Sequence, residues 1–332
     1  MKKTPARTHL HIENRKNSPW IFHITDGLWR SAVKRHRKLA ARLDVTIGWD
    51  GDILDTALKT ADCMIAPSPP RERLRERAPR LRWIHNRGAG IDHLLPLDWL
   101  PADIVLTNNT GVHGTKCEDY CTMALLMLAT RMPAMLDSQR AGRWEPLFTK
   151  PIAGNTAVVI GFGDLGSAAG RAAKKLGLKV IAVTRSGKAG RPADAAYKVS
   201  SLERVLPKAD FVIMTTPLTP QTRGLLNRER LALLKPSAGL INVGRSPLVD
   251  YDAVREMLTA RKLAGALLDV HSPEPLPADS PLWTTPNLVV TPHISCDDPR
   301  YIEFLLDRWF QNFARFLARK PLANQVDRRL GY

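Results

Sequence analysis

Three glycines at a fixed spacing form the clearest chemical motif in this 332-residue sequence. Gly161, Gly163 and Gly166 lie between an apolar run, residues 156–160, and a helical stretch, residues 167–176. In such a turn the first glycine permits a tight bend, the second lets the backbone approach a pyrophosphate, and the third lets the helix pack closely on the strand. The N–H groups that open the helix favour an anion. The motif therefore predicts a dinucleotide-binding site.

The end of the next expected strand, residues 179–183, decides which nicotinamide dinucleotide fits. NAD-binding folds usually place Asp or Glu there, to bind the ribose 2′-hydroxyl. The residues found there are Thr184, Arg185, Ser186 and Lys188. A carboxylate would repel a 2′-phosphate, whereas arginine can pair with one through two parallel donors. The sequence therefore predicts a preference for NADP(H); if the turn is only a solvated basic loop, NAD(H) is tolerated.

Five further segments resemble, in order and in spacing, one family of oxidoreductases. They are NRGAGIDH at 86–93, ADFVIMTTPLTPQTRGLLN at 209–227, LINVGRSPLVD at 240–250, LDVHSPEPLP at 268–277 and NLVVTPH at 287–293. They look like the substrate-carboxylate loop, the strand and loop under the cofactor, and the segments with the catalytic Arg, Glu and His of the D-isomer-specific 2-hydroxyacid dehydrogenases. The resemblance implies reduction of a 2-keto acid to the D-2-hydroxy acid by hydride transfer, for which the basic turn at 184–188 predicts NADPH as the preferred hydride donor.

The resemblance assigns acid–base chemistry to His293, paired with Glu274. Reduction of a keto group needs a hydride at carbon and a proton at oxygen, and a histidine titrates close to working pH. An adjacent carboxylate favours the imidazolium and orients the ring. His271 is a rival proton donor, at a position where the family often has an aromatic residue.

The resemblance also assigns the substrate and cofactor contacts. Arg245 would hold the substrate carboxylate and polarise the keto oxygen, and the N–H groups of Ala89 and Gly90 would bind the same carboxylate. Asp269 would accept a hydrogen bond from the nicotinamide carboxamide. The expected cofactor-binding residues are Gly161, Gly163, Asp164, Leu165, Gly166, Thr184, Arg185, Ser186, Lys188, Thr216, Pro217, Thr222, Val243, Gly244, Asp269 and His293. No metal ion is expected.

Two segments depart from the family pattern. After the catalytic His the family usually continues with small residues, whereas this chain has ISCDDP at 294–299. Cys296 either borders the substrate pocket, which would make the activity sensitive to thiol alkylation, or belongs to a hinge ahead of a helix. Near residue 118 the family's Ala-Glu pair is replaced by Glu118-Asp119-Tyr120, which leaves the local cofactor contacts open.

Strands that alternate with helices must position these residues. Strands or short apolar runs are expected at 20–25, 45–49, 61–66, 81–85, 104–107, 156–160, 179–183, 211–215, 239–243, 265–270 and 288–291. Helices are expected at 28–43, 117–130, 167–176, 252–260 and 301–318, after a flexible, polar arm at 1–19. This alternation predicts βαβ units and parallel sheets.

The resemblance implies an α/β fold of two Rossmann-like, doubly wound parallel-sheet domains with an active-site cleft between them. Residues 1–112 with 296–332 would form a flavodoxin-like substrate domain, and residues 113–295 the NAD(P)-binding domain. Hinges are expected near Gly111 and Ser295. Family members are usually homodimers joined through the cofactor domain, and Trp144 lies in the expected dimerisation segment.

Composition excludes several other classes of protein. The chain has 44% hydrophobic and 24% charged residues, as in globular proteins rather than disordered or collagen-like ones. Its longest nearly apolar stretch, residues 121–129, is far shorter than the roughly 20 residues that span a bilayer. No apolar stretch follows Lys2 and Lys3 as in a secretory signal. Four cysteines without a CxxC pair indicate reduced thiols, so a cytoplasmic protein without membrane partners is expected.

The net charge of +17 favours anionic ligands. The excess is spread along the chain, with local basic runs at 30–42 and 71–82, and no zinc spacing, RNP-like motif or basic zipper accompanies it. Solvated helix faces explain these runs, so no nucleic-acid partner is expected.

Two alternative functions stay open. One is an NAD-dependent member of the family, such as a phosphoglycerate dehydrogenase-like enzyme, and the other is a nucleotide-sensing corepressor of the same fold. Glyoxylate and hydroxypyruvate are the default substrates. The apolar segment 65–67 favours a larger 2-keto acid only weakly.

Overall fold

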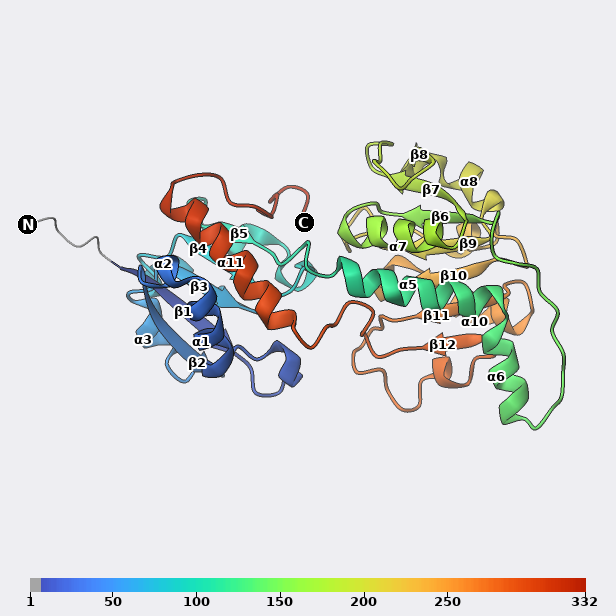
Figure 1. Cartoon of the computed structure of the whole chain (residues 1–332), viewed down its shortest axis with the longest axis horizontal. Coiled ribbons are helices and arrows are strands. Elements are labelled where there is room, and N and C mark those ends of the chain that lie inside the picture. The colour runs from blue at the N-terminus through green and yellow to red at the C-terminus, as the bar shows by residue number, and fades with distance from the viewer. Residues whose placement is uncertain (1–6) are drawn as a thin grey trace, which may run out of the picture. The chain divides into compact units, whose positions relative to one another are not determined.

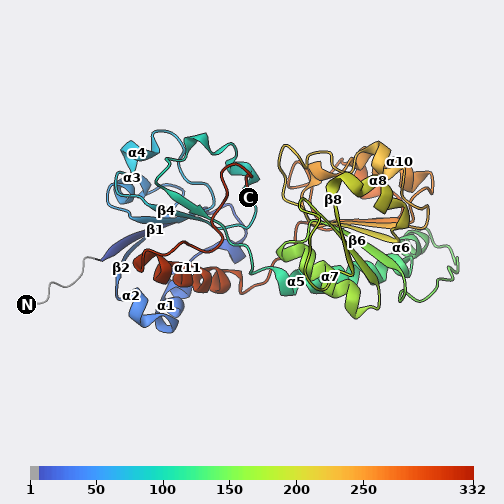
Figure 2. The same ribbon diagram turned by 90° about the horizontal axis from the view of Figure 1, so that it is seen from above.

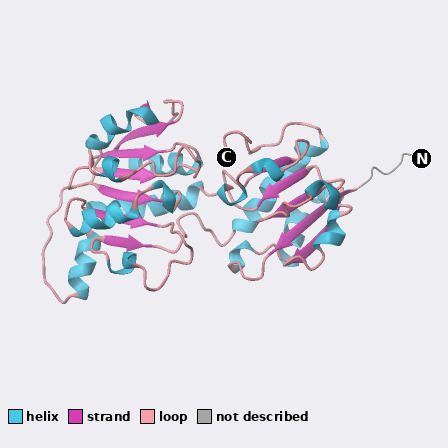
Figure 3. Cartoon of the chain, turned by 180° about the vertical axis from the view of Figure 1, so that it is seen from behind, coloured by secondary structure: helices cyan, strands magenta, loops and turns pink. Residues whose placement is uncertain are grey.

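The chain folds into two compact α/β units, each built on one parallel β-sheet (Figures 1 and 3). The computed structural model describes residues 7–332. One unit contains the residues up to Val112 together with Asp298–Tyr332, and the other contains His113–Asp297. Two parallel-sheet α/β domains are the fold class expected from the sequence, and the structure confirms it.

The first unit has a five-stranded sheet in the order β2-β1-β3-β4-β5. Its elements are β1 (Thr8–Asn14), α1 (Asp26–Arg35), α2 (Arg37–Ala40), β2 (Leu43–Trp49), α3 (Leu54–Leu58), β3 (Cys63–Ala66), α4 (Leu74–Arg77), β4 (Trp83–Asn86), β5 (Val105–Thr107) and α11 (Tyr301–Leu317). Figure 2 shows α1, α2 and α11 on one face of the sheet and α3 and α4 on the other. The ring of Trp309 on α11 stacks on Trp83 of β4, with centroids 5.1 Å apart, and anchors this helix in the core.

The second unit has a seven-stranded sheet in the order β12-β11-β10-β9-β6-β7-β8. Its strands are β6 (Thr156–Ile160), β7 (Lys179–Thr184), β8 (Ala195–Lys198), β9 (Phe211–Met214), β10 (Gly239–Asn242), β11 (Gly265–Leu268) and β12 (Leu288–Val290). Its helices are α5 (Gly114–Ala129), α6 (Met132–Arg140), α7 (Asp164–Lys175), α8 (Leu202–Val205), α9 (Arg228–Leu231) and α10 (Tyr251–Thr259). Alternate strand residues are buried on opposite faces, against α5 and α7 on one side and against α8, α9 and α10 on the other.

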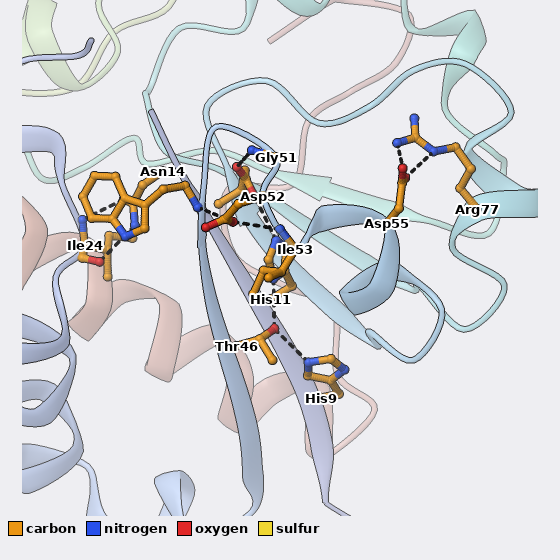
Figure 4. A network of polar contacts seen from close by, with 12 residues as sticks. His9, His11, Asn14, Ile24, Thr46, Gly51, Asp52, Ile53, Asp55 and Arg77 are labelled. Atoms are coloured by element: carbon orange, nitrogen blue, oxygen red, sulfur yellow. Dashed lines mark hydrogen bonds and ion pairs between the residues drawn. The ribbon is translucent and has the colours of Figure 1, made fainter. Parts of the chain in front are cut away.

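The first strand was wrongly predicted. Residues 1–6 of the expected flexible arm lie outside the described residues, but Thr8–Asn14 forms β1 next to the centre of the sheet. Its polar side chains are satisfied by neighbours: His11 bonds Thr46 at 2.9 Å and Glu13 at 2.9 Å, as Figure 4 shows in part. A polar strand can be buried when each polar group finds a partner, and the sequence pattern does not show those partners.

The expected strand at 20–25 is also wrong. Only a short 3₁₀ turn, Trp20–Phe22, forms there. The side chain of Asn14 bonds both the N–H and the carbonyl of Ile24, at 2.9 and 3.1 Å, and thereby replaces a strand partner for this segment.

Helix α6 and strand β8 of the second unit were not predicted. Pro133 does not simply follow the long helix; it lies in the first turn of a second helix, α6, where proline is tolerated. The edge strand β8 is short and only partly buried, so it has no apolar run by which to recognise it.

No helix in the described part of the chain is long and apolar enough to cross a membrane. Among residues 7–332, no group of three or more His, Cys, Asp or Glu side chains is arranged to hold a metal ion.

Candidate active site

The candidate residues of the second unit follow six neighbouring strands of one parallel sheet. The glycine turn follows β6, the basic turn follows β7, Thr216 follows β9, Arg245 follows β10, Asp269 follows β11 and His293 follows β12. Because parallel strands present their carboxyl ends at one edge, these residues share that edge. The strand order places His293, Asp269 and Arg245 along one half of it and the glycine and basic turns along the other.

The glycine turn leaves space where a dinucleotide phosphate would lie. Gly161 has a φ of +88°, which favours glycine, and a Cβ on Gly166 would lie 2.2 Å from the carbonyl oxygen of Gly161. A Cβ on Gly163 would meet nothing within 4 Å. The first helix turn of α7 includes Asp164 and Leu165, and no side chain caps its N-terminus. A helix N-terminus of this kind suits an anion.

The loop after β9 adds a buried hydroxyl to this edge. Thr216 Oγ1 is buried and has no hydrogen-bond partner among the described residues, and a Cβ on Gly161 would lie 2.9 Å from Thr216. Thr222 Oγ1 donates to the carbonyl of Pro217 at 2.7 Å and thereby closes the loop. An unsatisfied hydroxyl beside an open glycine turn fits a dinucleotide that supplies its acceptor.

Val243 and Gly244 continue β10 toward Arg245. Val243 is buried and its N–H donates to Met214 on β9 at 3.1 Å. A Cβ on Gly244 would lie 2.8 Å from Leu248 and 3.0 Å from the carbonyl oxygen of Thr216, so this position has no room for a larger residue.

The turn after β7 presents basic groups to solvent. Arg185, Ser186 and Lys188 are exposed, and the Thr184 hydroxyl donates to the carbonyl of Lys188 at 3.0 Å. Lys198 is a further cation that the sequence analysis missed: β8 pairs Lys198 with Thr184, and a Cβ on Gly187 would lie 2.8 Å from Lys198 Cγ. Only the pairing of β7 with β8 brings this lysine to the turn.

His293 and Glu274 form a hydrogen-bonded pair. Nδ1 of His293 lies 2.8 Å from Oε2 of Glu274, and the other carboxylate oxygen accepts the backbone N–H of His271 at 2.8 Å. The hydrogen bond to Glu274 raises the pKa of His293, while burial and the charge of Arg245 oppose the rise. Burial would raise the pKa of Glu274, but the hydrogen bonds from His293 and His271 bring it below its ordinary value. The pair therefore favours imidazolium with carboxylate.

The alternative proton donor, His271, is held differently. Its ring is buried and Nε2 lies 3.0 Å from the carbonyl oxygen of Thr291, which can only accept. The ring therefore donates its Nε2 proton to the backbone. Of these two histidines, His293 is the accessible one, since its side chain is 43% exposed.

Asp269 fixes the segment that contains His293. Its carboxylate accepts from the Thr291 hydroxyl at 2.6 Å and from the N–H groups of Ile294 and Ser295 at 2.9 Å each, and its carbonyl accepts the N–H of His293 at 2.8 Å. A carboxylate has about four acceptor positions. One position on Oδ2 therefore remains for an amide donor such as a nicotinamide carboxamide.

Arg245 lies close enough to His293 for its charge to lower the pKa of that ring. One guanidinium nitrogen donates to the carbonyl of Gly244 at 2.8 Å, and the side-chain amide of Asn242 donates to the Arg245 carbonyl at 3.0 Å.

His113, which directly precedes α5, is a buried neighbour of Arg245 and His293 that the sequence analysis missed. Burial lowers its pKa, and the charges of Arg245 and His293 lower it further, so it adds no positive charge at neutral pH.

The loop after β4, in the first unit, contains two neighbouring backbone N–H groups that are not used in hydrogen bonds within the described residues. Asn86 Nδ2 donates to the carbonyls of Gly88 and Gly90, at 2.8 and 3.1 Å. Within the described residues, no acceptor is bonded to the N–H groups of Ala89 or Gly90. Two such neighbouring donors suit a carboxylate.

Cys296 packs into the interior of the second unit. It lies against the core that contains Cys117 and Cys121, and its Sγ is 3.5 Å from the Ser295 hydroxyl. The neighbouring Cys117 thiol and burial raise the pKa of Cys296 well above its ordinary value. Because alkylation needs the thiolate, this position favours the structural alternative over a reactive thiol.

Residues 122–295, more than half of the chain, match the family model described as D-isomer-specific 2-hydroxyacid dehydrogenase, NAD-binding domain. The chain belongs to the D-isomer-specific 2-hydroxyacid dehydrogenases. The family inferred from the five sequence segments is therefore confirmed, and with it an oxidoreductase that uses a nicotinamide dinucleotide.

Known members of the family match between 77% and 98% of the chain. A glyoxylate reductase of Pyrococcus furiosus is 32% identical over 267 residues, which are 77% of this chain and 73% of that protein. The crystal structure of a D-isomer-specific 2-hydroxyacid dehydrogenase from Xanthobacter autotrophicus Py2, in complex with NADPH and MES, is 32% identical with a TM-score of 0.84 and covers 98% of this chain and 100% of that one. An NADPH-dependent glyoxylate/hydroxypyruvate reductase from Sinorhizobium meliloti, in complex with NADP and sulfate, is 26% identical with a TM-score of 0.80, at 98% and 100% coverage.

Proposed function

We propose that this dehydrogenase reduces a small 2-keto acid, with hydroxypyruvate and glyoxylate as the first candidates, and prefers NADPH. The observation that carries the acid–base part is the 2.8 Å pair of His293 and Glu274 beside Arg245. The basic turn after β7, without a carboxylate, supports the cofactor preference. The glyoxylate reductase and NADPH-bound relatives support both parts.

Each candidate residue has a separate role in the proposed reduction. The glycine turn, Thr216 and the basic turn would hold the nicotinamide dinucleotide, which would supply the hydride when bound. Arg245 binds the substrate carboxylate and faces the negative charge that develops on the keto oxygen. His293 gives its proton to that oxygen, and Glu274 stabilises the imidazolium before the transfer. We assign the second set of carboxylate donors to Ala89 and Gly90. The first unit is therefore the substrate domain and residues 113–295 are the cofactor domain.

The test is the loss of NADPH absorbance with hydroxypyruvate or glyoxylate, repeated with NADH. Faster turnover with NADPH supports the proposal, and equal or faster turnover with NADH favours the NAD-dependent alternative. Turnover with neither cofactor directs the search to larger keto acids or to the corepressor alternative, for which tight nucleotide binding without turnover is expected.

Arg185 is expected to set the cofactor preference. The substitution Arg185→Asp removes a charge-assisted pair, worth about 1.5–3 kcal/mol, and adds a charge that repels a 2′-phosphate. The ratio of kcat/KM for NADPH to that for NADH is therefore expected to fall by about 10–100-fold. Arg30→Asp makes the same charge change on an exposed face of the first unit and is the control. An unchanged ratio in Arg185→Asp would contradict the assignment.

An apolar segment of the second unit supports the proposed homodimer. Trp144 is 97% exposed, Phe148 is 94% exposed, and Leu147 lies between them in a stretch without helix or strand. Contiguous exposed apolar groups mark interaction surfaces. We expect the chain to have the mass of a dimer by light scattering and Trp144→Ala/Phe148→Ala to shift it toward the monomer. Trp20→Ala removes another exposed tryptophan and should leave the mass unchanged; a wild-type monomer would contradict the proposal.

We further propose that the enzyme acts in the cytoplasm. Its four cysteines are all free thiols, as is usual in a reducing compartment. Labelling with a fluorescent fusion and cell fractionation test this location.

A further inference from the structure

A hydrogen-bonded chain connects helix α5 to the segment that contains His293. The hydroxyl of Tyr120 lies 2.7 Å from Thr291 Oγ1, which lies 2.6 Å from Asp269 Oδ1. We infer that Tyr120 is a positioning residue for the acid–base step: it holds the Thr291 hydroxyl on Asp269 and thereby fixes the backbone on both sides of His293. This inference rests on the proposed role of His293.

The donor and acceptor of each of these two hydrogen bonds follow from the groups at the two ends, Tyr120 and Asp269. A carboxylate accepts, so Thr291 must give its single hydroxyl proton to Asp269. The Thr291 oxygen then accepts from Tyr120. Burial, and next the charge of Asp269, raise the pKa of Tyr120 well above its ordinary value. The phenol therefore keeps its proton over the whole working range and is always the donor.

These hydrogen bonds end at Asp269, the residue that holds the segment around His293 in place. Asp269 accepts from Thr291, Ile294 and Ser295 through its carboxylate and from His293 through its carbonyl. His293 itself has a φ of +55°, in the left-handed region. Such a conformation is unfavourable for most residues and persists where surrounding contacts enforce it. The bonds to Asp269 are those contacts.

Tyr120 acts on this arrangement through Thr291 alone. Within the described residues, the partners of the Thr291 hydroxyl are Tyr120 and Asp269. A hydroxyl that accepts one bond donates more strongly in the next. Without the phenol, Thr291 loses that support and keeps an acceptor that is partly buried and unpaired. His113, the residue that precedes α5, has its Nδ1 at 3.5 Å from the carbonyl oxygen of Cys296, so the start of α5 also contacts the segment after His293.

The test is Tyr120→Phe, which removes one oxygen from a buried ring. A displacement of about 1 Å at a reacting group costs roughly 10²-fold, and we expect the smaller displacement here to lower kcat about tenfold, with little change in KM for the keto acid. A looser His293–Glu274 pair also lowers the pKa of His293. The alkaline limb of the kcat/KM profile for reduction should then move to lower pH.

Several neighbouring titratable or charged groups affect the pKa of His293. These groups are Glu274, Arg245, Asp269, Asp297 and His113. The substitution Tyr120→Phe changes none of them, so a shift in the pKa of His293 reports a change in position. Histidine-ring NMR of the enzyme without cofactor measures that pKa independently of turnover.

A double-mutant cycle separates positioning from simple stability. Thr291→Val removes the hydroxyl through which Tyr120 acts, so Tyr120→Phe should have little further effect on kcat in that background. Thr291→Ser keeps the hydroxyl and should retain most of the activity. Additive losses in the double variant would overturn the inference.

A second result would also overturn it: Tyr120→Phe with a lower melting temperature but wild-type kcat, His293 pKa and pH profile. The proposed function fails differently, since the substitution His293→Asn would then leave keto-acid reduction intact. If the wild-type enzyme reduces no keto acid, the inference is decided by NMR, which compares the pKa of His293 in Tyr120→Phe with that in the wild-type protein.

Discussion

Replacing His293 by Asn is expected to lower kcat for keto-acid reduction by about 10²–10⁴-fold, the usual contribution of a general acid. Asparagine tolerates the left-handed backbone that His293 adopts, with a φ of +55°. Its amide can still donate to Glu274, but it has no proton to transfer at neutral pH. Affinity for NADPH, measured by fluorescence titration, should stay close to wild type, because the glycine and basic turns are untouched.

The matched substitution His271→Gln tests the competing histidine. His271 donates from its ring to the carbonyl of Thr291, so its loss disturbs the loop without removing the transferable proton. We expect it to cost less than tenfold in kcat. If His271→Gln were the more damaging substitution, the acid–base assignment would pass to His271.

The parallel sheets could be predicted because most strands are buried on both faces. Such strands are continuous apolar runs bounded by Gly, Pro and polar residues, as Val158–Ile160 of β6 and the whole of β9 show. β1 lacks this signature because His11, Glu13 and Asn14 are buried within it. Their partners, Thr46 on β2 and the backbone of Ile24 and Gly51, are known only once the chain has folded.

The candidate site could be predicted to the extent that each residue directly follows a strand. A parallel sheet then brings His293, Asp269 and Arg245 to one edge whatever the details of packing. Tyr120 and Lys198 could not be found in this way. Tyr120 reaches Thr291 because α5 packs across the sheet, and Lys198 reaches the basic turn because β8 pairs with β7. Neither contact has a local sequence motif.

Replacing Arg245 by Gln is expected to lower kcat/KM for the keto acid by about 10²–10³-fold, as when one donor to a developing oxyanion is removed. Arg245→Lys keeps the charge but not the forked geometry that matches a carboxylate, so its loss should be smaller. The guanidinium donates to the carbonyl of Gly244 and is held beside His293 rather than in the glycine turn. Affinity for NADPH should therefore be retained, and a variant that lost cofactor binding instead would contradict the role in substrate binding.

The pH profile tests this prediction independently, because a general loss of activity would not move the alkaline limb of kcat/KM in a particular direction. In the proposed mechanism reduction needs protonated His293, so we expect activity below its pKa in the folded enzyme and a loss of activity as the pH rises through that value. Arg245 lowers this pKa and Glu274 raises it. In Arg245→Gln the alkaline limb of kcat/KM should move to higher pH, and in Glu274→Gln it should move to lower pH. Limbs that moved in the same direction would show that the group titrating in the profile is not His293 between these two charges.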